Sequence, residues 1–121
     1  MTYRITYEVR ESYLFVKLEG PESYASAIHF WETLAEKSKL EAINNILIKD
    51  EVQGRLTTIE LHHLSELVSR LFRGKKIAYI DEKEATFEDN KFGETVILNR
   101  GGIVKLFKSE AEGQEWVTRG T

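Results

Sequence analysis

The chain has 121 residues, the size of a single domain spanning residues 1–121, and it is 41% hydrophobic and 31% charged. Its net charge of −3 gives no basic excess for nucleic acid, and the absence of cysteine excludes disulfides, thiolate nucleophiles and cysteine-based zinc sites. No apolar stretch reaches the length of a secretory signal or the ~20 residues of a membrane span, so we expect a cytoplasmic protein.

The chain opens with two segments in which apolar and polar residues alternate, as they do in half-buried strands. Ile5, Tyr7 and Val9 mark the first segment, and the second runs over residues 13–18. A connector of only three residues predicts that the two strands form an antiparallel hairpin. After Gly20 and Pro21 the apolar residues recur at helical spacing, which predicts an amphipathic helix over 22–38.

From there the pattern alternates between buried strands and helices. Thr57 or Thr58 is suited to cap the second helix, and Gly74 ends it. The remaining predicted elements are strands at 45–49, 76–81 and 103–107 and helices at 86–100 and 109–116. The order β-β-α-β-α-β-α-β-α predicts an α/β fold with a mostly parallel sheet and an antiparallel strand contributed by the hairpin.

The sequence lacks the motifs of the common nucleotide-binding and hydrolytic sites. It contains no glycine-rich dinucleotide fingerprint between a strand and a helix, no P-loop and no Gly-x-Ser-x-Gly elbow. His62 and Glu66 have the i, i+4 spacing that suits a shared metal, but His29 and His62 fall on outward faces. We therefore interpret the histidines as solvent-exposed and predict no catalytic residue, no cofactor and no metal.

One candidate site is the polar segment between the strand at 45–49 and the following helix. It joins the carboxyl end of a central strand to a helix N-terminus, which is where ligands and partners bind in open α/β sheets. The segment can serve as a helix cap or as an interaction or modification site. The candidate residues are Asp50, Glu51, Gln53, Gly54, Thr57 and Thr58.

A second candidate site is an apolar ridge on the helix at 86–100. If Phe92 and Val96 mark the inner face of this helix, Ile97 and Leu98 fall on its flanks. An exposed ridge of this kind is typical of an interface with a partner or with a second copy of the chain. A helix packed between the sheet and another helix explains the pattern equally well. The candidate interface residues are Ile97, Leu98, Asn99 and Arg100.

The C-terminal third carries a family resemblance. Residues 92–101 end in Asn-Arg-Gly and precede the short strand at 103–107 and a helix that finishes on the aromatic Trp116. This arrangement resembles the bacterial SpoIIAA-like group, which is related to STAS domains. The resemblance implies a mixed sheet of four to five strands with the helices largely on one side. It also implies a non-catalytic role, because STAS domains bind partner proteins and related Sec14-type folds carry lipids.

The chain departs from this family in the loop before the second helix. Antagonist STAS domains carry a phosphorylatable serine there, in an Asp-Ser-Ser/Thr-Gly loop. In this chain Glu51 follows Asp50, so the serine that accepts the phosphate is missing. The resemblance therefore supports a STAS-like module without the usual phosphorylation switch.

Three hypotheses for the function follow. The first is a regulatory module that docks a protein partner through the two candidate sites, and the ridge would also suit a homodimer. The second is a carrier of a small ligand or lipid, with a cavity lined by Phe30, Trp31 and Phe92. The third is an enzyme with perturbed acids around Glu60 and Asp81.

Overall fold

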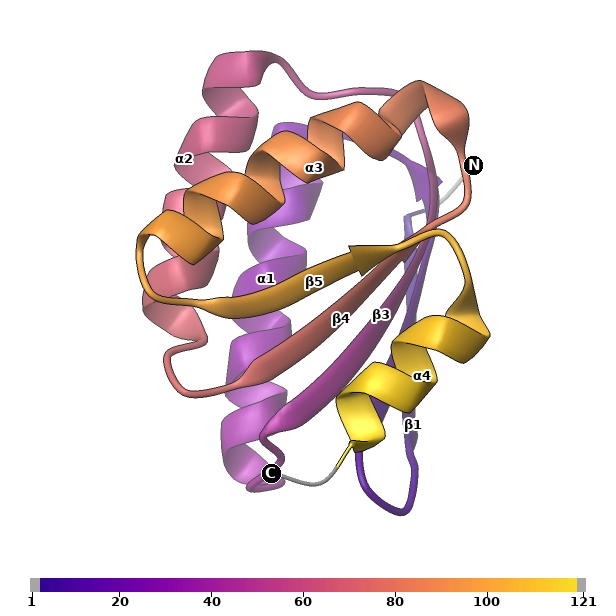
Figure 1. Cartoon of the computed structure of the whole chain (residues 1–121). Coiled ribbons are helices and arrows are strands. Elements are labelled where there is room, and N and C mark those ends of the chain that lie inside the picture. Colours follow the sequence, from indigo (N-terminus) through magenta and orange to yellow (C-terminus); the bar gives the residue numbers. More distant parts are fainter. Residues whose placement is uncertain (1–2, 120–121) are drawn as a thin grey trace.

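The computed structural model describes residues 3–119. Its strands are β1 (Arg4–Val9), β2 (Leu14–Pro21), β3 (Asn45–Gln53), β4 (Lys76–Asp81) and β5 (Ile103–Phe107). Its helices are α1 (Tyr24–Leu40), α2 (Thr58–Leu71), α3 (Glu84–Asn99) and α4 (Glu110–Thr118). The predicted order β-β-α-β-α-β-α-β-α is confirmed (Figure 1).

The five strands form one mixed sheet in the order β1-β2-β3-β4-β5, with β1 antiparallel to β2 and the other pairs parallel. Each helix between parallel strands returns the chain to the next position in the sheet, so spatial order follows chain order. The register aligns Leu18 with Asp50 and Asp50 with Asp81. The carboxyl ends of β2, β3 and β4 therefore meet at one edge of the sheet.

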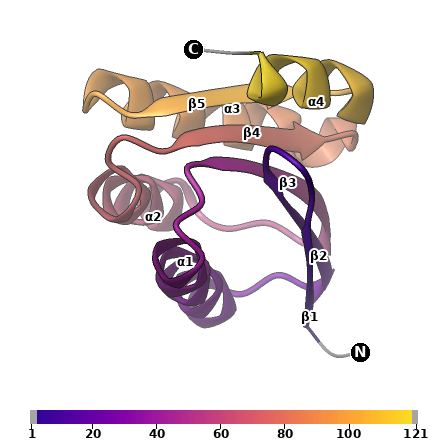
Figure 2. The same cartoon turned by 90° about the horizontal axis from the view of Figure 1, so that it is seen from below.

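The helices cover the two faces of the sheet unequally. Figure 2 shows α1 and α2 on one side and α4 on the other. Strand alternation divides the core accordingly: Ile46 and Ile48 belong to the cluster that also contains Ile97 of α3, whereas Leu47 packs in the cluster of α4. Three helices thus share the larger core, and α4 covers a smaller one.

Local capping explains where three of the helices begin. Ser23 and Ser109 accept hydrogen bonds from the backbone N–H groups three residues further on. Thr57 is the N-cap of α2 and forms a capping box with Glu60, which selects it over Thr58. Among the described residues, no helix is both long and apolar enough to cross a membrane.

The predicted loop after residue 49 is wrong, because β3 continues to Gln53. Asp50 pairs with both Leu18 and Asp81, and Gln53 pairs with Pro21 of the similarly extended β2. Beyond Asp50 the strand continues because β2 is extended equally far and pairs with it up to Gln53. The loop itself begins only at Gly54.

The predicted inner face of α3 is confirmed for Val96, which is buried, but is wrong for Phe92. Phe92 is 37% exposed, whereas Ile97 is 8% exposed and belongs to the larger core. Gly93 and Glu94 face inward instead. The Glu94 carboxylate can be buried because it accepts a hydrogen bond of 2.6 Å from the backbone N–H of Leu106.

Candidate functional site

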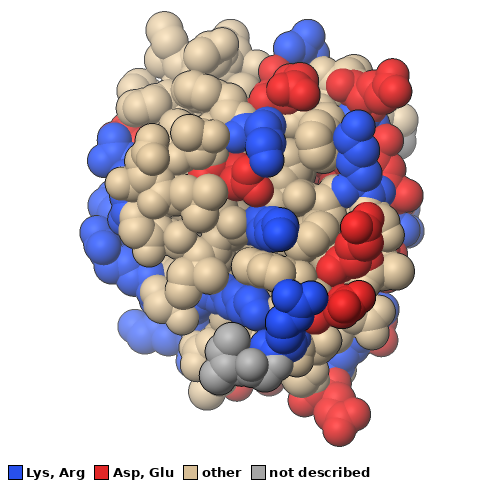
Figure 3. Space-filling view, viewed as in Figure 1, with Lys and Arg blue, Asp and Glu red and all other residues tan. Residues whose placement is uncertain are grey.

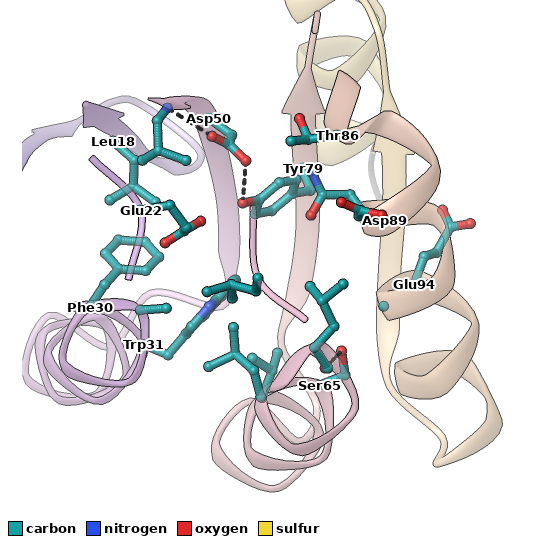
Figure 4. A pocket seen from close by; sticks show the side chains of 18 of the residues that line it. Leu18, Glu22, Phe30, Trp31, Asp50, Ser65, Tyr79, Thr86, Asp89 and Glu94 are labelled. Carbon is teal, nitrogen blue, oxygen red and sulfur yellow. Dashed lines mark hydrogen bonds between the residues drawn. The ribbon is translucent and has the colours of Figure 1, made fainter. Parts of the chain in front are cut away.

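A pocket opens where the carboxyl ends of β2, β3 and β4 face α1, α2 and α3 (Figure 4). Its cavity volume is about 80 Å³. Strand alternation directs polar residues into this region. Asp50 follows Ile46 and Ile48 on the face covered by α1, α2 and α3, and Tyr79 follows Ile77 on the same face. The pocket therefore combines acidic groups from the strand ends with apolar side chains from the helices.

Asp50 lies at the centre of this polar group and is 5% exposed. Its carboxylate accepts hydrogen bonds from the backbone N–H of Val52 at 3.0 Å, the Tyr79 hydroxyl at 2.8 Å and the Lys83 ammonium at 3.3 Å. Burial and the neighbouring Asp50 charge hold the pKa of Tyr79 well above its ordinary value. Tyr79 is therefore fixed as a hydrogen-bond donor to Asp50.

Asp81 is fully buried at the end of β4 and is completely paired. It accepts hydrogen bonds from Thr86 and Asn90 at 2.7 Å each, and from the backbone and side-chain nitrogens of Lys83 at 2.9 Å each. Burial opposes its ionisation, but the hydrogen bonds from Thr86 and Lys83 outweigh it and lower the pKa of Asp81. Asp81 therefore tethers the start of α3 to β4.

Glu22 differs from both aspartates because one of its oxygens has no donor. Its Oε1 is buried without a hydrogen-bond partner among residues 3–119. In Figure 4 its carboxylate lies between the Phe30 ring and the Asp50–Tyr79 pair. Burial, followed by the charge of Asp50, raises the pKa of Glu22 to about 7. This carboxyl group therefore changes charge near neutral pH.

Aromatic rings form the wall facing these acids. Trp31 stacks on Tyr79 with ring centroids 6.2 Å apart and an interplanar angle of 21°. Phe30 packs edge-on against Trp31 with centroids 5.0 Å apart. Tyr3 also lines the pocket, and burial with the charges of Glu22 and Asp50 raises its pKa above the ordinary value. The pocket thus has an acidic side and an aromatic side.

An ion pair crosses the rim of the pocket. Arg55, just after the left-handed Gly54, donates two hydrogen bonds to Asp89 of α3, at 2.8 and 2.9 Å. This bidentate pair joins the β3–α2 loop to α3. Because the Arg55 guanidinium is already engaged with Asp89, it is not free to bind an anion inside the pocket.

The structure separates the residues of the predicted binding segment. Asp50 and Gly54 line the pocket, but Glu51 lies on the opposite face of the sheet, within 3.4 Å of the Lys17 ammonium. Gln53 and Thr58 are exposed, and Thr57 is engaged in the capping box. Asp50 is therefore the acidic residue of that segment that reaches the pocket.

The structure also separates the residues of the predicted ridge on α3, some of which are buried and some exposed. Ile97 is buried in the core, as expected for a helix packed between the sheet and another helix and not for an exposed ridge, whereas Leu98 is 48% exposed. Asn99 is exposed, and Arg100 bonds to Glu66 of α2 with a nitrogen–oxygen distance of 2.5 Å. The exposed part of the ridge is reduced to Leu98, Asn99 and Arg100.

The histidines of α2 form a group separate from the pocket. Ligand atoms of His62, His63 and Glu66 lie within 4.8 Å of one another, a closeness that the sequence interpretation did not anticipate for His63. Glu66 is already bound to Arg100, and none of the three lines the pocket. The hypothetical enzyme acids are also engaged, since Asp81 is fully paired and Glu60 completes the α2 capping box.

We did not predict three residues of this site from the sequence: Glu22, Tyr79 and Lys83. Glu22 and Lys83 lie just after the carboxyl ends of predicted strands, so the rule that ligands bind at these ends would have pointed to them, whereas Tyr79 lies within its strand. The predicted cavity residues Phe30 and Trp31 do line the pocket, whereas Phe92 does not.

Comparison with solved structures identifies the fold. The chain is similar to an uncharacterised protein of the DUF3478 family with a SpoIIAA-like fold from Shewanella loihica PV-4, at a TM-score of 0.57 and 18% sequence identity. The match covers 95% of this chain and 93% of that chain. The chain therefore has a SpoIIAA-like fold, as its C-terminal segment indicated. No protein-family model and no curated protein sequence matches the chain.

Proposed function

We propose that this protein is a non-catalytic, STAS-like binding module that recognises a small ligand in the pocket at the carboxyl ends of β2, β3 and β4. The observation that carries the proposal is the buried, unpaired Oε1 of Glu22 beside acids whose oxygens are engaged. Buried polar groups in folded proteins are nearly always hydrogen-bonded, and an unpaired one costs about 1–3 kcal/mol. A ligand that donates to Glu22 would remove this cost.

The size of the pocket sets the size of the ligand. A volume of about 80 Å³ is roughly half that of an engineered apolar cavity of about 150 Å³ that admits benzene. Pockets for drug-sized ligands range from about 300 to 1,000 Å³. The geometry therefore favours a molecule of a few non-hydrogen atoms over a lipid tail.

Two indole N–H groups provide a direct test. Trp31 is a pocket residue, whereas Trp116 packs in the cluster on the opposite face of the sheet. The probes are a cation, a neutral molecule and an anion, each of four non-hydrogen atoms. We expect at least one of them to shift the Trp31 indole resonance saturably in ¹H–¹⁵N spectra and to leave the Trp116 indole resonance unchanged. Acetamidinium, acetamide and acetate form a matched set because they share one shape.

A pocket-filling variant supplies the control. Ala27 is 4% exposed and lines the pocket, so Ala27→Leu should occupy the space and abolish the Trp31 response. Its melting curve would show that it still folds. If all three probes leave the Trp31 resonance of the wild-type protein unmoved, the proposal is wrong.

A second candidate function is docking of a protein partner on the surface shared by α2 and α3. Ile59 is 70% exposed and Leu98 48% exposed. Uncharged side chains dominate the upper left of Figure 3, over α2 and the adjoining part of α3, and Lys and Arg side chains lie along the left edge below them. The double variant Ile59→Asp/Leu98→Asp should keep the wild-type melting temperature and lose a partner that the wild-type protein retains in a pull-down. Retention of that partner by the variant would remove this candidate.

A further inference from the structure

We propose that the ligand of this pocket is a small organic cation with N–H donors, and that the Glu22 carboxylate is the group that pairs with it. This inference rests on the proposed function and adds the chemical class of the ligand. Three features of the pocket support it: the excess of acids over cations, the aromatic wall and the unpaired Oε1 of Glu22.

Every acid at the pocket except Glu22 contacts a cation, but Asp50 and Asp81 share one lysine, so four acids face three cations even before Glu22 ionises. Lys83 contacts both Asp50 and Asp81, at 3.3 and 2.9 Å. The other acids that line the pocket also have cations: Asp89 pairs with Arg55, and Glu94 pairs with Lys91. Within residues 3–119, no ion pair reaches Glu22. When Glu22 ionises, it therefore adds to an excess of negative charge at this edge of the sheet that a cationic ligand would neutralise.

The aromatic wall suits the organic part of such a cation. The faces and edges of Phe30, Trp31 and Tyr79 line the space beside Glu22. An aromatic ring attracts a cation through its quadrupole, by about 0.5–2 kcal/mol depending on desolvation. The same rings contact alkyl groups without leaving a polar atom unpaired. A planar amidinium can therefore pair with the carboxylate while it packs against the rings.

Other ligand classes fit less well. An anion would face Asp50 and Glu22, and the Arg55 guanidinium is engaged with Asp89. Magnesium and calcium take six or more oxygen ligands, but both oxygens of Asp50 already accept hydrogen bonds. A neutral donor satisfies Oε1 without neutralising its charge, so it should bind more weakly than a cation of the same shape.

The binding equilibrium should depend on pH. Burial raises the pKa of Glu22 to about 7, so a cation binds best once the proton has left. At pH 6 about one-tenth of the Glu22 carboxyls are ionised, and at pH 8 about nine-tenths are. The affinity for a cation should therefore rise about tenfold between these values. The titratable groups that face Glu22 are Tyr3 before β1, Asp50 of β3, Tyr79 of β4 and Lys83 before α3.

The test compares acetamidinium, acetamide and acetate by the Trp31 indole shift at pH 8, where acetamidinium stays charged. We expect acetamidinium to bind at least tenfold more tightly than either isostere. Glu22→Gln keeps the shape of the side chain and should weaken acetamidinium binding at least tenfold. Glu36→Gln makes the same change on the exposed face of α1 and should leave the affinity unchanged.

The outcomes separate this inference from the proposed function. If acetamide or acetate binds as tightly as acetamidinium, the inference that the ligand is a cation is wrong, and the proposed ligand-binding function stands. If none of the three probes binds, both the inference of a cationic ligand and the proposed ligand-binding function are wrong. If Glu22→Gln folds, as its melting curve would show, and still binds acetamidinium like the wild-type protein, Glu22 is not the pairing group.

Discussion

Two carboxyl groups at the same edge of the sheet, those of Asp81 and Glu22, have pKa values shifted in opposite directions by their surroundings. Asp81, at the end of β4, accepts four hydrogen bonds of 2.7–2.9 Å. Glu22, just after β2, has a buried oxygen without a partner among residues 3–119. Although burial opposes ionisation at both, the pKa of Asp81 is lowered and that of Glu22 is raised to about 7. The number of donors, rather than burial alone, decides the direction.

This difference divides the site into a scaffold and a recognition group. The β4 region holds Asp81, Thr86, Asn90 and Lys83 in a network whose members satisfy one another. The β2 region presents Glu22 toward the pocket. Substitutions in the first region should cost stability, whereas substitutions in the second should cost binding and gain stability.

The largest effect is expected at Asp81. Asp81→Ala leaves the Thr86 hydroxyl and the Asn90 amide without their acceptor and removes one of the two carboxylates that contact Lys83. Breaking a buried charged network from one side costs about 3–5 kcal/mol. Urea denaturation at pH 7 should therefore show a loss of this size in the free energy of unfolding.

The matched control is Asp89→Ala, which removes an aspartate from the rim of the same pocket. Its partner Arg55 is 63% exposed, so the pair is screened by solvent and should contribute much less. Equal losses from the two variants would contradict the division between an interior scaffold and the rim.

A smaller effect of opposite sign is expected at Glu22. Its pKa is higher in the folded protein, about 7, than its ordinary value of 4.5. The folded state therefore holds the proton more tightly, and stability falls as the pH rises from about 4.5 to about 7. Glu22→Gln abolishes this loss, so above pH 7 it should be about 1–3 kcal/mol more stable than the wild-type protein.

Urea denaturation at pH 4.5 and pH 8 measures this linkage. The two proteins should have similar stabilities at the lower pH and differ at the higher one. Glu36→Gln serves again as the control, because its exposed side chain should change stability little at either pH. A Glu22→Gln variant that is less stable than the wild-type protein at pH 8 would show that the carboxylate has a stabilising partner.

Helix α3 shows where sequence reasoning reached its limit. The apolar pattern placed Phe92 on the inner face, but the packed face contains Gly93 and the buried Glu94. A Cβ atom at Gly93 would lie 3.0 Å from the Ser65 hydroxyl, so close approach of α2 makes this glycine part of the interface. Hydrophobic periodicity does not detect such positions, because glycine has no side chain and glutamate reads as a surface residue.

The predicted binding segment illustrates the same limit in a strand. The prediction treated Asp50 and Glu51 as one polar surface, but they belong to β3 and alternate between its faces. Asp50 faces the pocket and Glu51 faces Lys17 and Lys49 on the α4 side. A strand extended by a few residues turns neighbours in sequence into residues on opposite sides of the sheet.

By itself, the sequence determined the order of the elements, the opening hairpin, a helix cap at Thr57 or Thr58 and the resemblance to the SpoIIAA-like fold. These depend on local periodicity and on side chains that bond to nearby backbone groups. Only the tertiary structure decided which acids are paired, because Glu22, Asp50 and Tyr79 come from separate segments. Desolvation and pairing arise when packing brings such groups together, and no local pattern records them.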